Sequence, residues 1–402
     1  MFKYTNRACA LVLALVLTIV TLSPIVVTAA SASDSEVSNY NSLYITAGDS
    51  IISRDKLINI FDELTQRLQL RLGKQYRLEN FCFDFTERVV GNVLYVDIDV
   101  YFYMTLLQHP RYGSFAQGMI EVMQTQESEI DQYAVQSAIN KILLDAAEVY
   151  YAPILTRVLY SISFGNINDS RMVGTTNYEI YYRMNSEDGI LLSSVEAVLQ
   201  RSISDNDAFL HGMFVAQEAL ASPVEFEIGA FSTRPTFRRL GARDWARANA
   251  YHSRGHRYYL PPDVPGTNCA NFVSWALHNG GGLPQVNQNT STQTWRSGWT
   301  SAGFRWPGDH WIRTGFHSNG GVTTYMVQRN WFVRETDWRR VAAGSIMFWT
   351  NTSHVALVTA GDTINVWFAE NGARQSSNTL FNPNTHIVRF YVPNTSTLNV
   401  VH

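Results

Sequence analysis

Cys269 and His354 are the two side chains of this 402-residue chain whose types best suit one chemical task, the attack of a thiol on a carbonyl carbon. A cysteine reacts as its thiolate, and it needs a base, usually histidine, that takes up the thiol proton. The two residues are far apart in the sequence, so the fold must bring them together. The residues around each of them indicate which elements do this.

Cys269 is predicted to open a helix. Pro and Gly at 265–266 interrupt the preceding segment, and Thr267 or Asn268 can cap the helix. Three glycines at 280–282 would end it. The unpaired N–H groups and the positive end of the helix dipole stabilise a thiolate at this position, and the same N–H groups can face the oxyanion that forms on attack.

An apolar stripe on the same helix would bury one of its faces against a sheet. The stripe follows the cysteine at helical spacing and consists of Phe272, Val273, Ala276 and Leu277. The alternative for Cys269 is a buried, unreactive cysteine, because a free cysteine also behaves as a small apolar residue.

His354 is predicted to begin a β-strand. A first strand over 344–349 and a turn precede it, and the alternation of the next residues places the imidazole on one face with Ala356 and Val358. We expect the Cys269 helix to pack on that face. The alternative is a histidine without a catalytic role, since the chain contains ten histidines.

A third group usually orients the imidazole of such a pair by accepting its second N–H. The segment 363–371 is predicted to return as a strand beside His354, and it carries Asn365, Glu370 and Asn371. Asn371 is the first choice for this position and Glu370 the second, because antiparallel register is not fixed by one sequence.

The composition of the chain changes near residue 240. All ten tryptophans follow that point, and from Gly241 onward thirteen Arg, no Lys and seven acidic residues give a charge of +6, against −11 for residues 33–240. We therefore predict a domain over 33–222, a linker over 223–240 and a second domain over 241–402. Hydrophobic content of 46% indicates packed cores throughout.

The first predicted domain is an α+β domain of unknown function. Apolar residues alternate in Leu94–Tyr103 and in 81–85, which predicts strands, and 178–184 is similar. Helical spacing occurs in Asp55–Leu72, in much of 115–159 and in 207–220. No spacing in this half is typical of a metal site, a phosphate loop or a catalytic cluster.

Residues 1–32 are predicted to be a signal peptide, so the protein is expected to be secreted or attached to the cell envelope. Lys3 and Arg7 precede an apolar run over 8–27, and cleavage is expected after Ala30 or Ala32. Contact with a membrane is expected only under the alternative, in which the segment is kept as an anchor.

The block Asn268-Cys269-Ala270-Asn271-Phe272-Val273-Ser274 resembles the cysteine motif of a family of secreted bacterial amidases related to the NlpC/P60 and CHAP groups of papain-like hydrolases. Typical members read Asp-Cys-Thr-Asn-Phe-Val-Ser-Gln. Here Asn268, Ala270 and Trp275 replace the Asp, Thr and Gln. The blocks 344–346 and 353–358 look like the family's second motif, and the resemblance covers about 240–392.

The resemblance implies a papain-like domain, in which the Cys-bearing helix packs on a small antiparallel sheet. It implies that Cys269 is the nucleophile and His354 the base of a hydrolase that cleaves an amide bond in peptidoglycan peptides through an acyl-thioester. Asn268, Trp275 and Trp299 are expected to contact the substrate. The alternatives are a non-catalytic wall-binding or adhesion module and an acyltransferase that acts on amines.

No cofactor and no metal are expected. His252 and His256 have the i, i+4 spacing of metal ligands, but Gly255 interrupts the helix between them. The arginines of the second domain suggest anionic wall polymers as partners, and nucleic acid is not expected. Cys82 and Cys269 are expected to stay reduced, since a disulfide between them would remove the nucleophile.

Overall fold

The structure is a computed structural model that describes residues 51–166, 178–183, 191–194, 205–221, 234–264, 266–285, 295–300, 303–304, 307–315, 320–350, 353–372, 375–381 and 388–401. The predicted signal peptide lies outside these residues. Within them, no helix combines the length and the apolar character that crossing a bilayer requires.

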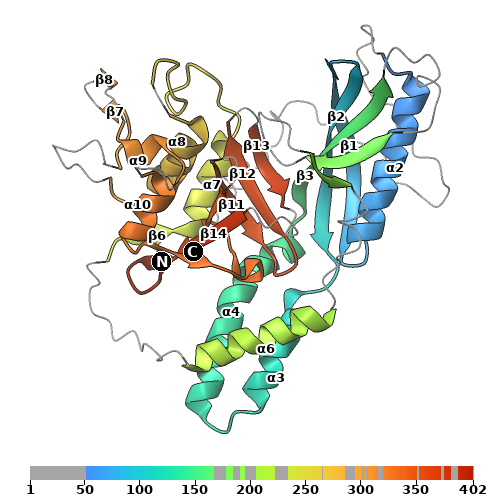
Figure 1. The fold of residues 1–402 in the computed structure, drawn as a ribbon. Coiled ribbons are helices and arrows are strands. Elements are labelled where there is room, and N and C mark those ends of the chain that lie inside the picture. The colour runs from blue at the N-terminus through green and yellow to red at the C-terminus, as the bar shows by residue number, and fades with distance from the viewer. Residues whose placement is uncertain are drawn as a thin grey trace, which may run out of the picture. The chain divides into compact units, whose positions relative to one another are not determined.

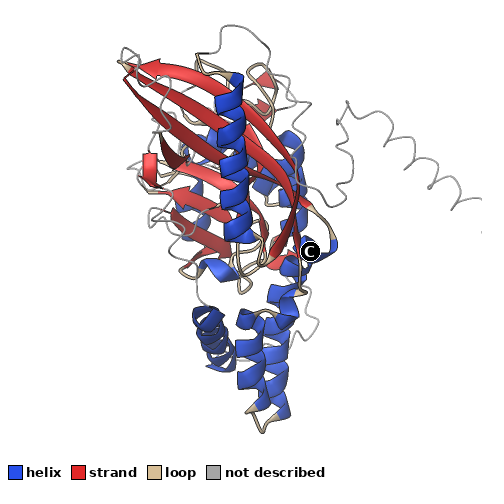
Figure 2. Cartoon of the chain, turned by 90° about the vertical axis from the view of Figure 1, so that its right-hand side faces the viewer, coloured by secondary structure: helices blue, strands red, loops and turns tan. Residues whose placement is uncertain are grey.

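Long antiparallel strands form the N-terminal part of the main sheet. They are β1 (Tyr76–Val90), β2 (Val93–Leu106) and β3 (Ile154–Asn166), with the shorter β4 (Glu179–Arg183) paired to β3 and β5 (Leu191–Ser194) paired to β4. β2 confirms the predicted alternation, because Val96, Ile98 and Val100 are fully buried. Helix α2 (Arg54–Leu72) lies across the long strands (Figure 2), and its Phe61 ring stacks on Phe83 of β1 at 4.4 Å.

Three helices pack around a small core of their own. They are α3 (Ser114–Gln124), α4 (Glu129–Tyr151) and α6 (Asp205–Ala221), which form a bundle in Figure 1. The helix predicted to run towards residue 159 ends at Tyr151 instead. Pro153 explains the difference, because proline disfavours helical backbone at the residue before it, and the chain enters β3 directly afterwards.

Two glycines allow α3 and α6 to cross at close range. A Cβ atom on Gly118 of α3 would lie 2.0 Å from the carbonyl oxygen of Phe209, and one on Gly212 of α6 would lie 1.9 Å from that of Phe115. Both obstacles are backbone atoms, which do not move aside as a flexible side chain can. The two helices therefore depend on the absence of side chains at their crossing point.

We expect Gly212→Ala to lower the free energy of unfolding by about 1–3 kcal/mol, because the helices must separate to make room for the methyl group. The measurement is a urea titration followed by circular dichroism. Glu121→Ala on the exposed side of α3 is the control and should change the stability by less than about 0.5 kcal/mol. Equal stability of the two variants would contradict the close crossing.

The C-terminal half continues the sheet with six strands in the order β9–β14–β10–β11–β12–β13, each antiparallel to its neighbour. They are β9 (Phe332–Glu335), β10 (Ile346–Trp349), β11 (His354–Gly361), β12 (Val366–Asn371), β13 (Gln375–Leu380) and β14 (Val388–Pro393). β10, β11 and β12 are buried along almost their whole length, because both faces of the sheet are covered.

Helices α7 (Arg239–Asn249) and α8 (Asn268–Trp275) cover one face of these strands. A π-helical turn, η2, continues α8 over Ala276–Gly280 and packs on α7. A Cβ atom on Gly280 would lie 2.4 Å from the carbonyl oxygen of Gly241. The glycine at 280, predicted only to end the helix, therefore also allows α7 and η2 to approach each other.

Short elements complete the C-terminal half. They are β6 (Thr236–Arg238), β7 (Trp299–Thr300), β8 (Gly303–Phe304), α9 (Asp309–Ile312), α10 (Val322–Gln328), η3 (Trp338–Arg340) and β15 (Asn399–Val401), while η1 (Pro110–Tyr112) lies before α3. β6 pairs in parallel with β15, and Phe237 is fully buried. The end of the predicted linker, 234–240, thus belongs to the folded C-terminal half.

The two halves share one sheet within residues 59–402, which form a single compact unit. β13 pairs in parallel with β3 at Thr379 and Arg157, and the two strands lie side by side in Figure 1. The Trp367 indole N–H donates to the Thr156 hydroxyl at 2.9 Å. The change in composition near residue 240 therefore does not mark a break in the sheet, and the fold is α+β, as predicted.

Candidate active site

Cys269 lies in the first turn of α8, as its sequence context predicts. Thr267 is the N-cap residue, with extended backbone, and the first helical hydrogen bond runs from Asn271 N–H to the carbonyl of Thr267. The N–H groups of 268–270 precede that pattern and are directed along the helix axis. Cys269 is 6% exposed. Its sulfur therefore sits at the positive end of a helix, in a largely dry environment.

Two buried polar residues of α8 hold the helix in place. The Asn271 amide donates to the Tyr258 carbonyl at 2.7 Å and accepts from the Trp311 indole at 2.9 Å. The Ser274 hydroxyl donates to the Trp311 carbonyl and accepts from the Trp295 indole, both at 3.0 Å. Asn271 and Ser274 thus fix the orientation of α8 through the tryptophans beside it.

His354 is the first residue of β11, and it meets the sulfur of Cys269 through a side-chain hydrogen bond. The prediction that the Cys269 helix packs on the strand face that carries Ala356 is wrong, however. Val355 and Leu357 share the core of Cys269, whereas Ala356 packs in a separate cluster on the other face.

The position of His354 at the end of its strand explains how it still reaches the sulfur. The ring lies at the start of β11, an interior strand of the sheet, and packs on Trp349, with the two ring centroids 4.8 Å apart. A residue inside the strand would be confined to its own face.

The third position is occupied by Glu370. Its Oε2 atom lies 2.9 Å from Nε2 of His354, and its side chain is fully buried. The register that pairs Leu357 with Ala369 makes Glu370 a diagonal neighbour of His354 on the same face. Because Glu370 engages Nε2, Nδ1 is the nitrogen that remains for the sulfur.

Asn371, the first choice for the third position, points away from His354. Its Nδ2 donates to the carbonyls of Ala250 at 2.8 Å and His252 at 3.0 Å. Asn371 follows Glu370 in an extended strand, so the two side chains lie on opposite faces. It fixes the segment after α7 to the end of β12.

The charges of the site stabilise a thiolate–imidazolium pair. Burial by itself raises the pKa of Cys269, but the charge and hydrogen bond of His354, the Thr267 hydroxyl and the Val355 N–H outweigh it and lower this pKa below the ordinary thiol value. Burial by itself lowers the pKa of His354, but Cys269 and Glu370 raise it to about 10. The pKa of the sulfur is therefore lowered and that of the ring raised, and both shifts favour the thiolate–imidazolium form of the pair.

Glu370→Gln is expected to lower the pKa of His354 below about 10, because the amide keeps the shape of the carboxylate but removes the charge that favours the imidazolium. Any activity that needs the imidazolium should then begin to fall at a lower pH, because its decline at high pH follows the pKa of His354. The measurement is an NMR titration of the labelled histidines, with the His354 signal assigned by its loss in His354→Gln.

Asn371→Ala is the matched control for this titration. It breaks two hydrogen bonds to buried backbone carbonyls, which should cost about 1–3 kcal/mol of stability and leave the pKa of His354 unchanged. A shift of the His354 titration in Asn371→Ala, with none in Glu370→Gln, would reverse the assignment of the third residue.

The residues predicted to contact substrate lie in different environments. The Asn268 amide oxygen accepts from the Leu260 N–H at 3.1 Å, and its nitrogen donates to the Asn371 carbonyl at 3.2 Å. Trp275 is 7% exposed, and its ring lies 5.1 Å from that of Trp311, edge to face. Asn268 and Trp275 therefore hold the fold around the site, and the Trp299 side chain lies outside the described residues.

Thr267 is a site residue that the sequence did not reveal as such. It was predicted only as a possible helix cap, yet its hydroxyl makes no capping bond; it donates to the Ile312 carbonyl at 3.3 Å and also lies close enough to the sulfur of Cys269 to lower the thiol pKa. Its position directly before the helix was the signal that the sequence offered. The one hydroxyl hydrogen can be donated either to the Ile312 carbonyl or to the thiolate.

No group of three or more metal-ligating side chains occurs among the described residues. His252 and His256 stack on each other with their ring centroids 3.5 Å apart, and Asn249 Oδ1 lies 2.6 Å from Nε2 of His252. Cys82 and Cys269 are both free thiols, so Cys269 is not blocked by a bridge between them.

Comparisons of the chain with family models, with curated proteins and with solved structures found no match. The resemblance to secreted amidases therefore stays a prediction from the motifs. Any function proposed for this protein therefore rests on the geometry of its own residues.

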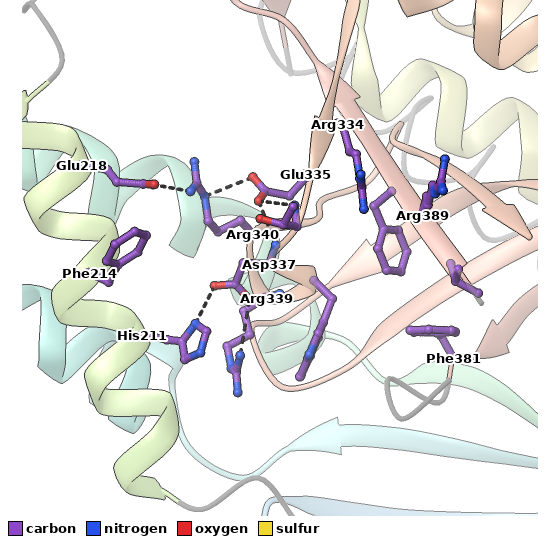
Figure 3. A pocket seen from close by; sticks show the side chains of 14 residues that line it. His211, Phe214, Glu218, Arg334, Glu335, Asp337, Arg339, Arg340, Phe381 and Arg389 are labelled. Atoms are coloured by element: carbon purple, nitrogen blue, oxygen red, sulfur yellow. Dashed lines mark hydrogen bonds and ion pairs between the residues drawn. The ribbon is translucent and has the colours of Figure 1, made fainter. Parts of the chain in front are cut away.

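A pocket of about 490 Å³ lies apart from the candidate triad, between α6 and the segment from β9 to η3 (Figure 3). Its charges largely pair with one another: Glu218 with Arg340, Arg340 with Glu335 at 3.2 Å, and His211 with Asp337 at 3.2 Å. These pairs connect α6 to the C-terminal strands, and we assign them a structural role.

Proposed function

We propose that the protein is a cysteine-dependent amidohydrolase or peptidase that cleaves an amide bond through an acyl-thioester. The observation that carries this proposal is the array Cys269–His354–Glu370, in which a helix N-terminus and an imidazole meet at one sulfur and a buried carboxylate contacts the other side of that imidazole. A structural cysteine needs no such environment, since an apolar pocket alone raises the thiol pKa.

The proposed reaction begins with the attack of the Cys269 thiolate on the amide carbonyl carbon. A C–S bond forms, and the carbonyl oxygen becomes an oxyanion that the N–H groups at the start of α8 can stabilise. The tetrahedral intermediate collapses with cleavage of the C–N bond, while the His354 imidazolium donates its proton to the leaving nitrogen. An acyl-thioester and a free amine result.

Water completes the cycle. Neutral His354 accepts a proton from the water, whose oxygen attacks the thioester carbonyl. The C–S bond breaks, the acid is released, and the thiolate–imidazolium pair is restored. Glu370 stabilises the imidazolium in both steps and keeps the ring oriented, without giving or taking a proton itself.

The papain-like architecture, export and a peptidoglycan substrate belong to the same proposal and rest on the motif resemblance. The arrangement of a Cys-bearing helix on an antiparallel sheet, with the histidine at a strand start, supports the papain-like part. Affinity for anionic wall polymers is proposed from the arginine-rich composition after residue 241.

Digestion of purified peptidoglycan tests the proposed activity. The wild-type protein should release fragments with new amine and carboxyl ends, detected by mass spectrometry, whereas Cys269→Ala should release none. Digestion with an added primary amine reveals acyl transfer, since the acyl group would then appear on the amine. Identical digests by both proteins, with binding to the wall retained, would instead support the non-catalytic binding module.

A further inference from the structure

Arg157 is a buried arginine of the N-terminal half that lies close to the Cys–His–Glu site. Arg157 lies on β3 at the one register position where β3 pairs with β13, opposite Thr379. Its side chain is only 7% exposed. A buried guanidinium is costly unless it is paired, so its partners indicate its role.

The guanidinium contacts both halves of the sheet. Its Nη2 donates to Oδ2 of Asp99 at 2.5 Å, and its Nη1 donates to the Gln375 carbonyl at 3.1 Å. Gln375 pairs with Asn371, the residue after Glu370, and Glu370 itself pairs with the neighbouring Ser376. Arg157 thus lies beside the end of β12 that presents the carboxylate to His354.

The electrostatics agree with this position. Burial by itself lowers the pKa of the Arg157 guanidinium, but Asp99, Tyr101 and Glu370 raise it above its ordinary value. Asp99, which accepts directly from the guanidinium, is the main counter-charge of Arg157, and Glu370 adds a smaller contribution.

We propose that Arg157 is a positioning residue of the active site, through which the N-terminal half holds the strand ends that place the Glu370 carboxylate beside His354. This inference rests on the proposed function and extends it, because the C-terminal half alone would lack the hydrogen bond from Arg157 to the Gln375 carbonyl. The N-terminal half then forms part of the enzyme in addition to any binding role.

The test is the pH dependence of Cys269 alkylation by iodoacetamide in the full chain, read for each cysteine by mass spectrometry of peptides. Arg157→Gln removes the ion pair with Asp99 and loosens the strand ends that hold Glu370 against His354, so the imidazolium and the thiolate that it stabilises are both less favoured. The acid limb should therefore move to higher pH by about 0.5–1 unit. Arg157→Lys keeps the charge and should restore at least half of the shift.

Arg88→Gln is the matched control for loosening of the sheet. Arg88 pairs with Asp97 at 3.0 Å across β1 and β2, two strands that do not pair with β13. Arg88→Gln should leave the acid limb of Cys269 alkylation at the pH of the wild-type protein. The inference would be overturned if the acid limb of Cys269 alkylation stayed in place or moved to lower pH in folded Arg157→Gln. An equal shift in Arg88→Gln would also overturn it. If wild-type Cys269 itself titrates as an ordinary thiol, the proposed function fails instead.

Discussion

His354→Gln is expected to slow the alkylation of Cys269 at pH 6 by about a hundredfold, because the thiolate loses the imidazolium that stabilises it. In the wild-type protein the positive ring and its hydrogen bond outweigh the cost of burying the sulfur. Without them, burial raises the thiol pKa, and only a small fraction of the cysteine is ionised at pH 6. The measurement is the rate of iodoacetamide labelling at Cys269.

His256→Gln serves as the control for this substitution. His256 is partly exposed and stacks on His252, away from the contacts that His354 makes. Its loss should leave the labelling rate within about twofold, as expected for a surface change. Equal rates in wild type and folded His354→Gln would show that His354 does not activate the thiol.

Cys269→Ala is expected to lower the rate of amide hydrolysis by at least about 10³-fold, because it removes the thiol that is proposed to form the acyl intermediate. The change removes one sulfur atom from a well-packed site, so the fold should persist. Cys82→Ala is the control: Cys82 is exposed on β1, and burial and Asp84 raise its pKa. Its loss should not affect hydrolysis, and the rate constants are compared on the same peptide substrate.

Retained hydrolysis in Cys269→Ala would exclude the acyl-thioester route. Mass spectrometry of the acid-quenched wild-type reaction adds an independent observation, since an acylated peptide containing Cys269 should accumulate if release of the acyl group is slow. An acyl group on any other residue would assign the nucleophile elsewhere.

The first turn of α8 and the strand of His354 could be predicted from the sequence because local signals determine them. A Pro-Gly break at 265–266, an apolar stripe and a glycine-bounded end specify the helix, and β-branched alternation specifies the strand. Which face the helix covers could not be predicted in this way. β11 is buried on both faces, so its sequence does not distinguish them.

The third residue of the site depended on register. Glu370 and Asn371 are adjacent, and a slip of one residue exchanges the faces to which they point. The structure decides between them through the pairing of Leu357 with Ala369. A carboxylate against His354 also suits the chemistry better than an amide, because only the carboxylate carries a charge that favours the imidazolium.

The contribution of Arg157 had no signal in the sequence. It depends on a single parallel register position between strands that are more than two hundred residues apart, and the steep change in composition near residue 240 suggested two separate domains instead. Long-range pairing of this kind is set by tertiary packing, which local patterns do not encode.

The most direct measurement is the pH titration of the two thiols of the wild-type protein, by labelling rates resolved for each peptide. Cys269 should reach half of its maximal rate below the ordinary thiol value of about 8.5, and Cys82 above it. A Cys269 midpoint at or above the ordinary value would show that no stabilised thiolate exists, and the catalytic role of the site would then be wrong.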